Sequence, residues 1–173
     1  MVETVINALI RDVPDFPKPG IVFKDITPIL SSPAAMTAIY DALAAPYREA
    51  GITKVIGIES RGFIFGTPLA GRLGVGFVPI RKPGKLPWKT VSTSYALEYG
   101  EDSIELHVDS VGPDDRVVIV DDLLATGGTL EAACRLVKGM GSEIVGCSVV
   151  IELGFLEGRA KLADHTIHSL VKY

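Results

Sequence analysis

The sequence predicts a single α/β domain over residues 1–173, built on an open, mostly parallel twisted sheet flanked by helices. The first observation is that short apolar runs of strand type alternate with helical apolar stripes through the middle of the chain. The second is that several of these runs are apolar throughout, which is typical of parallel strands buried on both faces. The third is the length, because 173 residues suit one domain with a full core.

Helix and strand signals place the elements of the first half of the chain. Apolar residues at helical spacing begin at Val5, and the proline-rich segment 12–20 ends that helix in a loop. Ser32 and Pro33 are typical of a helix start, and Gly51 of a helix end. The expected elements are helices at 5–10, 33–50 and 63–73 and strands at 54–58 and 75–80.

The second half begins with a basic segment rich in Pro and Gly, at 81–90. Two alternating stretches after it predict an antiparallel hairpin with a flexible loop, at 91–98 and 104–108. Apolar strands and helical stripes then alternate again to the end of the chain. The expected elements are strands at 117–120, 144–151 and 166–171 and helices at 129–140 and 155–163.

The overall charge argues against two classes of partner. With 17 basic and 21 acidic residues the formal charge is −4, so no overall field draws the chain to nucleic acid or to an acidic membrane surface. A bound polyanion must therefore meet a local cluster of cations.

The sequence also shows no membrane or export signal. The longest apolar stretch, at 144–151, is too short to span a bilayer. The N-terminus lacks the basic start and apolar run of a signal peptide, which favours a cytoplasmic protein.

The cysteines and histidines give no metal-site signal. Cys134 and Cys147 lie in apolar stretches without CxxC spacing, so reduced, buried thiols are expected. His107, His165 and His168 form no HExxH pattern and are assigned neither to a metal nor to catalysis.

The most informative segment is VVIVDDLLATGGT, residues 117–129. A buried strand delivers Asp121 and Asp122 at its carboxyl end, where open α/β sheets bind ligands, and a small-residue turn then opens a helix. Backbone N–H groups, the helix dipole and two threonine hydroxyls favour a phosphate there. The two carboxylates suit the hydroxyls of a sugar attached to that phosphate. The simpler alternative is a strand-turn-helix junction in which Asp and Thr only cap the helix.

Other nucleotide and hydrolase motifs are missing from the sequence. It contains no GxxxxGK[ST] and no GxGxxG that opens a helix, and Ser60 in GIESRG lacks the GxSxG spacing. The 117–129 segment resembles the 5-phosphoribosyl-1-pyrophosphate (PRPP) signature of the type I phosphoribosyltransferases. This resemblance implies that the 5-phosphate is held by Ala125, Thr126, Gly127, Gly128 and Thr129, and that Asp121 and Asp122 contact the ribose.

Four further segments are similar to adenine phosphoribosyltransferases within that family. They are PDFPKPGIVFKDITPIL, ESRGFIFG, VPIRKPGKLP and SYALEYG, and the resemblance runs from residue 14 to about residue 159. It implies the type I phosphoribosyltransferase fold with a small N-terminal hood at 1–32. It also implies transfer of the phosphoribosyl group to N9 of adenine, giving AMP and pyrophosphate in purine salvage, with Mg²⁺ held mainly by PRPP, and a homodimer.

Four cations are candidates for the pyrophosphate: Arg61, Arg81, Lys82 and Lys85. Arg61 follows a strand and can present a planar guanidinium, and the other three charge the neighbouring loop. The alternatives are a surface salt bridge for Arg61 and ordinary solvated charges for the rest. By resemblance, Arg81 reaches the PRPP of the neighbouring subunit, and the Glu59–Ser60 peptide is cis.

The remaining site residues come from the resemblance. Glu98 matches the catalytic glutamate that shares the N7 proton of adenine, with Tyr99 beside it on the loop. Adenine would lie between Phe23 and Leu153 and be read by backbone groups at Val22 and Lys24. Without the resemblance, Glu98 is a solvated hairpin residue, and Tyr99, Phe23 and Leu153 are packing residues.

Two rival functions use the same fold. One is the same reaction on hypoxanthine, guanine, xanthine or orotate, against which SYALEYG argues. The other is a PRPP-sensing regulator that binds nucleic acid, which would need a basic face or an added DNA-binding module. A chain of 173 residues with a pI of about 5.4 offers neither.

Overall fold

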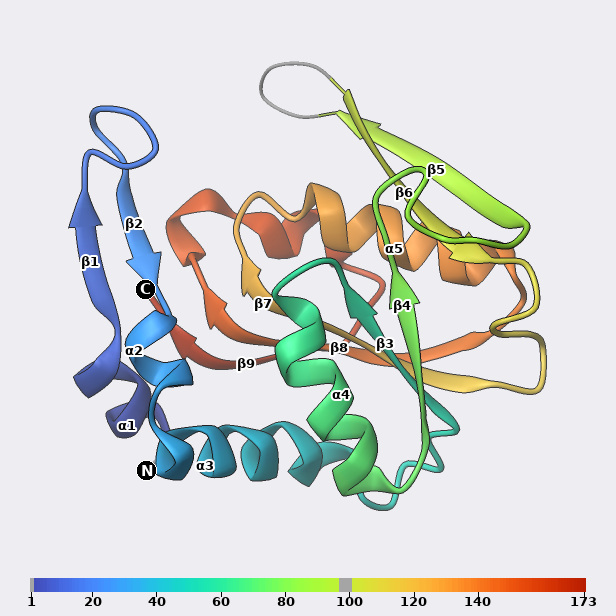
Figure 1. Cartoon of the computed structure of the whole chain (residues 1–173), viewed down its shortest axis with the longest axis horizontal. Coiled ribbons are helices and arrows are strands. Elements are labelled where there is room, and N and C mark those ends of the chain that lie inside the picture. Colours follow the sequence, from blue (N-terminus) through green and yellow to red (C-terminus); the bar gives the residue numbers. More distant parts are fainter. Residues whose placement is uncertain (1, 97–100) are drawn as a thin grey trace.

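The computed structural model describes residues 2–96 and 101–173, and its centre is a five-stranded parallel sheet (Figure 1). The strand order is β4-β3-β7-β8-β9, and every neighbouring pair is parallel. The predicted open, mostly parallel sheet is therefore confirmed. Its strands are β3 (Lys54–Ile58), β4 (Gly76–Ile80), β7 (Arg116–Leu124), β8 (Glu143–Glu152) and β9 (Ile167–Lys172).

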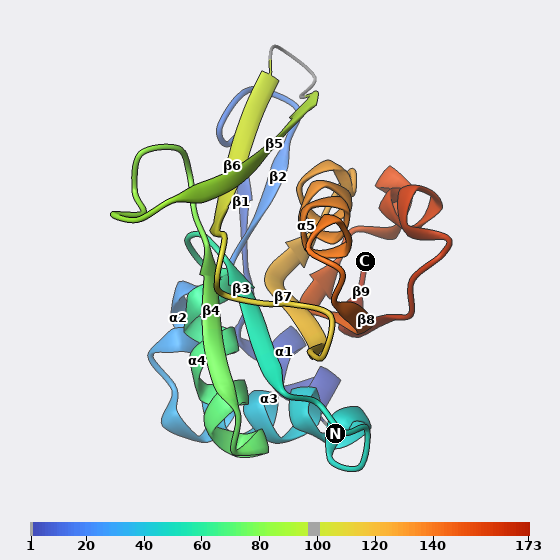
Figure 2. The ribbon, with the colours of Figure 1, turned by 90° about the vertical axis from the view of Figure 1, so that its right-hand side faces the viewer.

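Two apolar cores lie on opposite faces of this sheet, and Figure 2 shows helices on both sides of it. Along β7, Val117 and Ile119 belong to one core, whereas Val118 and Val120 belong to the other. Burial on both faces explains why the sequence of this strand is apolar without alternation. One face is covered by α1 (Val2–Leu9), α3 (Pro33–Ala44) and α4 (Gly62–Leu73), and the other by α5 (Gly128–Gly139) and the antiparallel pair β5 (Thr90–Ala96) and β6 (Glu101–His107).

Helix boundaries follow the capping signals closely. The Ser32 side chain accepts a hydrogen bond from the N–H of Ala35 at 3.3 Å, and Pro33 occupies the first turn of α3. Gly74 ends α4 with φ of 69°, a left-handed conformation that glycine adopts without strain. The helix expected to reach residue 50 ends earlier, because α3 passes into the 3-10 turn η1 (Ala45–Tyr47).

The loop predicted for the proline-rich segment 12–20 is confirmed only for residues 15–20, which form a connecting turn. They join an antiparallel pair that the sequence did not predict, β1 (Arg11–Pro14) and β2 (Val22–Asp25), and the short helix α2 (Thr27–Leu30) follows it. The two strands are short and half exposed, with prolines at the end of β1 and in the turn between them, so they carry little of the alternation that predicts a strand. With α1, they make up the N-terminal segment that was expected to form a hood.

The helix predicted at 155–163 is also wrong. The chain there forms two 3-10 turns, η2 (Gly154–Leu156) and η3 (Gly158–Leu162). Glu157, between them, has φ of 52°, which interrupts any continuous helix. Strand β7 extends beyond the predicted 117–120 because Asp121 to Leu124 continue to pair with β8.

Two local expectations are confirmed. Cys134 and Cys147 are buried and free, with their Sγ atoms 3.5 Å apart. The Glu59–Ser60 peptide bond is cis, as is Phe16–Pro17.

Candidate functional site

Several of the predicted site residues lie at the carboxyl ends of strands of the parallel sheet, whose arrangement is drawn in Figure 1. Arg61 follows β3, Arg81 follows β4, and Leu153 follows β8. Asp121 and Asp122 lie near the end of β7, which leads into α5. Because parallel strands end at the same edge, the topology brings together residues that are far apart in the sequence. The β1–β2 and β5–β6 hairpins both project on this side of the sheet.

The turn between β7 and α5 encloses a small cavity of about 80 Å³. Gly127 is the N-cap of α5 and has φ of 82°. The first N–H groups of a helix have no partner within the helix, so the start of α5 supplies donors beside this cavity. The cavity is lined by Asp121, Leu123, Leu124, Ala125, Thr126, Gly127, Thr129 and Leu130.

This turn also depends on a contact that the sequence did not reveal. A Cβ on Gly127 would lie 2.4 Å from the carbonyl oxygen of Gly158, and a Cβ on Gly158 would lie 2.2 Å from that of Ala125. Both positions therefore require glycine for close backbone approach. No sequence signal links them, because the two glycines lie 31 positions apart in the chain.

Asp121 and Asp122 form an acidic pair beside the turn. Asp122 is 4% exposed, and its Oδ2 lies 3.0 Å from Nε of Arg61, while its N–H donates to Oδ1 of Asp121 at 2.8 Å. Burial, followed by the neighbouring Asp122 carboxylate, raises the pKa of Asp121 well above its ordinary value. Burial also raises the pKa of Asp122, although Arg61 acts in the opposite direction.

Gly62 allows Arg61 to approach this pair. A Cβ on Gly62 would lie 2.7 Å from the carbonyl oxygen of Val120 and 3.2 Å from Oδ1 of Asp121. The first turn of α4 therefore lies directly against the end of β7. Arg61 is the N-cap residue of α4, so its guanidinium reaches Asp122.

Lys82 and Arg81 also pair with carboxylates of the same chain. Arg81 binds Glu59 through Nε and NH2, at 3.1 and 3.2 Å. The Lys82 ammonium donates to Asp102 and to the hydroxyl of Tyr95. Burial alone would lower the pKa of Lys82, but these hydrogen bonds outweigh burial and raise it.

The fourth candidate cation, Lys85, lies farther from its carboxylate. Its Nζ is 3.9 Å from Oε1 of Glu59. Every cation assigned to pyrophosphate from the sequence therefore faces a carboxylate in the single chain. Whether Arg81 serves the partner's site stays a prediction.

The residues expected around the base lie on β2 and at the end of β8. The Phe23 ring centroid is 5.7 Å from Cζ of Arg61, the residue that pairs with Asp122. Strand β2 therefore lies beside Arg61. Lys24 donates from Nζ to Asp12 at 2.7 Å and lies 4.2 Å above the ring of Tyr173. The Lys24 side chain is thus engaged by Asp12 and Tyr173.

The other residues expected at the base site are Val22, Leu153, Glu98 and Tyr99. Val22 is 51% exposed. The N–H of Leu153 donates to the carbonyl of Leu124 at 2.9 Å, which fixes Leu153 beside the turn. Glu98 and Tyr99 lie outside the described residues.

Sequence reasoning missed an ionic cluster around a buried carboxylate next to Leu153. The Glu152 side chain is 3% exposed and accepts hydrogen bonds from Nε and NH2 of Arg159, both at 2.8 Å, and from Ser169 at 2.7 Å. The Arg159 hydrogen bonds are the largest cause that lowers the pKa of Glu152 to about 2. Arg159 follows Gly158, so this cluster holds η3 against the β7–α5 turn.

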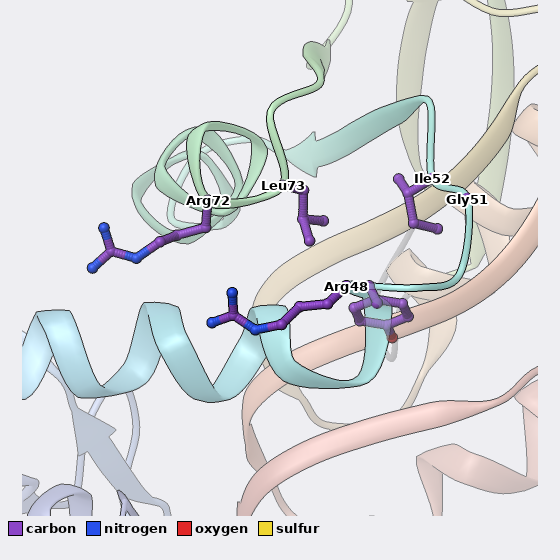
Figure 3. Close-up of a pocket in the computed structure, with 6 residues that line it drawn as sticks. Arg48, Gly51, Ile52, Arg72 and Leu73 are labelled. Atoms are coloured by element: carbon purple, nitrogen blue, oxygen red, sulfur yellow. The ribbon is translucent and has the colours of Figure 1, made fainter.

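A second cavity, of about 230 Å³, lies away from this site (Figure 3). Gly51 and Ile52 in its wall precede β3, and Arg72 and Leu73 precede β4, so the cavity is at the amino ends of the strands. Arg72 also lies in the last turn of α4, where a cation complements the helix dipole, and it binds Asp41 at 2.8 Å. Arg72 thus has a structural explanation, and the cavity is not part of the candidate site.

The described residues were also compared with the patterns of metal sites and membrane-spanning helices. Within residues 2–96 and 101–173, no three His, Cys, Asp or Glu side chains are grouped to hold a metal ion. In the same part of the chain, no helix has the length and apolar character needed to cross a membrane.

Comparison with known proteins identifies the family. The phosphoribosyl transferase domain model matches residues 25–168. Adenine phosphoribosyltransferase of Nitrosococcus oceani is 57% identical over 164 residues, covering 95% of this chain and 96% of the relative. The corresponding Thermobifida fusca protein is 56% identical, covering 98% of this chain and 96% of the relative.

Solved structures agree with the sequence relatives. The crystal structure of adenine phosphoribosyltransferase from Rhodothermus marinus has a TM-score of 0.94 at 53% identity, covering 99% of this chain and 98% of that one. The Saccharomyces cerevisiae enzyme, solved with an imino-altritol bisphosphate and adenine, has a TM-score of 0.93 at 38% identity, covering 98% of both chains. The family model, the relatives and the solved structures agree. The chain is therefore a phosphoribosyltransferase and belongs to the adenine phosphoribosyltransferases within that family.

Proposed function

We propose that the chain transfers the 5-phosphoribosyl group of PRPP to N9 of adenine, giving AMP and pyrophosphate. The observation that carries the proposal is the end of β7, where Asp121 and Asp122 adjoin a glycine turn and the start of α5 around a cavity of about 80 Å³. The names of the relatives support adenine as the base.

The proposed 5-phosphate site is the turn from Ala125 to Thr129. Its donors are the N–H groups at the start of α5 and the hydroxyls of Thr126 and Thr129. Asp121 and Asp122 are proposed to accept hydrogen bonds from the ribose hydroxyls. Their raised pKa values mean that removing them from water is costly, and hydroxyl donors from a sugar would compensate for that cost.

The chemical step is a displacement at C1 of the ribose. The bond from C1 to the pyrophosphate oxygen breaks, a bond from C1 to N9 of adenine forms, and the base loses one imidazole proton. The sugar is cationic in the transition state, so the nearby Asp121 and Asp122 carboxylates stabilise it electrostatically. Arg61, Arg81, Lys82 and Lys85 are proposed to bind the departing pyrophosphate.

The donor set fits a magnesium ion held mainly by PRPP. Two adjacent carboxylates, those of Asp121 and Asp122, are what the chain offers at this point, and Mg²⁺ is commonly bound by one or two carboxylates plus substrate oxygens. When bound, the ion would neutralise charge on the leaving pyrophosphate.

The proposed adenine site lies between Phe23 and Leu153, with backbone groups at Val22 and Lys24 reading the edge of the base. The ion pair of the Lys24 side chain with Asp12 supports a backbone role for Lys24. Glu98 is proposed to hold the N7 proton, with Tyr99 beside it on the same loop. Residues 1–32 would form the hood, and the homodimer and the cytoplasmic location stay predictions.

The test is turnover with five bases. The purified protein is incubated with PRPP, Mg²⁺ and adenine, hypoxanthine, guanine, xanthine or orotate, and the nucleotide is separated by chromatography. We expect AMP from adenine, no comparable product from the other four, and loss of turnover when EDTA removes the metal. Equal turnover of hypoxanthine and adenine would contradict the proposed base specificity.

A further inference from the structure

Glu59 joins the two loops that carry the proposed pyrophosphate cations. It is the first residue after β3, two residues before Arg61, and its N–H donates to the carbonyl of Ile80 at the end of β4 at 2.9 Å. Its side chain is 14% exposed and points to the basic loop that begins at Arg81. A carboxylate so placed fixes one loop relative to the other.

Three hydrogen bonds converge on this one carboxylate. Nε and NH2 of Arg81 donate to the two oxygens at 3.1 and 3.2 Å, and the backbone N–H of Lys82 donates to Oε2 at 3.0 Å. Burial alone would raise the pKa of Glu59, but these hydrogen bonds outweigh burial and lower it. Glu59 is therefore charged at neutral pH and holds the guanidinium in a bidentate geometry.

The remaining contacts of Arg81 complete its orientation. NH1 donates to the carbonyl of Lys85 at 3.1 Å, which closes the basic loop on itself. The backbone of Arg81 exchanges two hydrogen bonds with the backbone of Glu105 on β6, at 3.0 and 2.8 Å. The main chain of Arg81 is thus held by β6, and its side chain by Glu59.

We propose that Glu59 is a positioning residue for PRPP, which orients the Arg81 guanidinium and the 81–85 loop for the pyrophosphate group. This inference rests on the proposed function. The same contact could also weaken PRPP binding. A carboxylate that is paired with Arg81 and close to Lys85 competes with pyrophosphate for both cations. We favour positioning, since the bidentate pair and the Lys82 N–H together fix a geometry that charge alone does not need.

Glu59→Gln separates these two roles from each other. The amide is nearly isosteric but cannot accept both Arg81 hydrogen bonds, so Arg81 loses its orientation. We expect KM for PRPP and Kd for magnesium pyrophosphate to rise by about tenfold, with KM for adenine within about twofold of the wild type. Glu59→Asp keeps the charge and is expected to recover part of the PRPP affinity. Thermal unfolding verifies that both variants fold.

Glu105→Gln is the matched control. Glu105 accepts a hydrogen bond from the Gly84 N–H at 3.2 Å in the same loop, and its side chain is not part of the proposed binding machinery. This change removes the same charge near the loop, and KM for PRPP is expected to stay within about twofold.

The outcomes distinguish the inference from the function on which it rests. Absence of AMP formation by the wild type refutes the proposed function. Normal wild-type turnover with an unchanged or lowered KM for PRPP in Glu59→Gln refutes positioning, and a lowered KM identifies Glu59 as a competitor for the cations. An equal rise in Glu105→Gln also overturns it, because the effect would then come from a general disturbance of the loop and not from loss of the Glu59–Arg81 pair.

Discussion

Replacing Glu152 by Gln should destabilise the fold in a way that depends on pH. The carboxylate is 3% exposed and binds Arg159 through two hydrogen bonds of 2.8 Å, with Lys172 Nζ 3.4 Å away. These contacts lower the pKa of Glu152 from 4.5 to about 2, and the hydrogen bonds from Arg159 are the largest cause. A carboxylate with a lowered pKa in the folded state stabilises the fold above the pKa of the unfolded state.

The magnitude follows from the shift in pKa. A difference of about 2.5 units corresponds to about 3 kcal/mol at neutral pH. Arg159 and Lys172 are 45% and 63% exposed, so solvent screens the pair, and about 2 kcal/mol is the better expectation. This contribution is complete above pH 4.5 and is lost as the pH falls from 4.5 toward 2, because the carboxylate becomes protonated in the folded state.

Urea unfolding of both proteins at pH 7, 5, 4 and 3 measures this directly. The difference in unfolding free energy should be about 2 kcal/mol at pH 7 and should shrink below pH 4.5. Glu143→Gln is the control, because Glu143 and its partner Arg116 are 56% and 43% exposed and the pair should contribute less than about 1 kcal/mol. A difference for Glu152→Gln that stays constant from pH 7 to pH 3 would refute the reasoning.

Three further predictions concern the proposed site. Thr126→Val should raise the Kd for PRPP, measured by calorimetry, with unchanged thermal unfolding, because Thr126 is exposed in the turn. Glu98→Leu should lower kcat by on the order of 10² with little change in PRPP affinity; an unchanged kcat would leave Glu98 a solvated hairpin residue. Arg81→Ala and Asp122→Asn should each be nearly inactive, but reassorted mixed dimers should recover about a quarter of native activity if Arg81 acts across a two-fold interface. Mixtures that stay at background, with mixed dimers verified by native mass spectrometry, exclude the shared site.

The elements that sequence predicted best are those whose environment is uniform along their length. Strand β3 matches the predicted 54–58, because burial on both faces demands an apolar residue at nearly every position. The β7–α5 turn was recognisable because its residue types are chosen for local reasons, glycine for left-handed backbone and threonine for small polar donors. By contrast, the β1–β2 hairpin is half exposed and interrupted by prolines, so periodicity did not detect it.

Contacts between distant residues could not be read from the sequence. Gly158 is required by the carbonyl of Ala125, and Gly127 by that of Gly158, yet each glycine alone indicates only a turn. This contact also changes how Gly127→Val should be interpreted. A valine there would block close backbone approach to a phosphate, but its Cβ would also lie 2.4 Å from the carbonyl oxygen of Gly158, at a φ of 82°, so the substitution perturbs the fold as well.

The charge of the proposed anion site is also a long-range property. Counting Arg61, Arg81, Lys82 and Lys85 along the chain suggests four free positive charges, but Glu59, Asp102 and Asp122 accompany them. Among these seven described side chains the excess is one positive charge, which is small against a pyrophosphate group. Affinity for PRPP must then come from oriented donors and not from net charge. This is why we expect the carboxylates that orient those cations to matter for binding, although their own charge opposes the ligand.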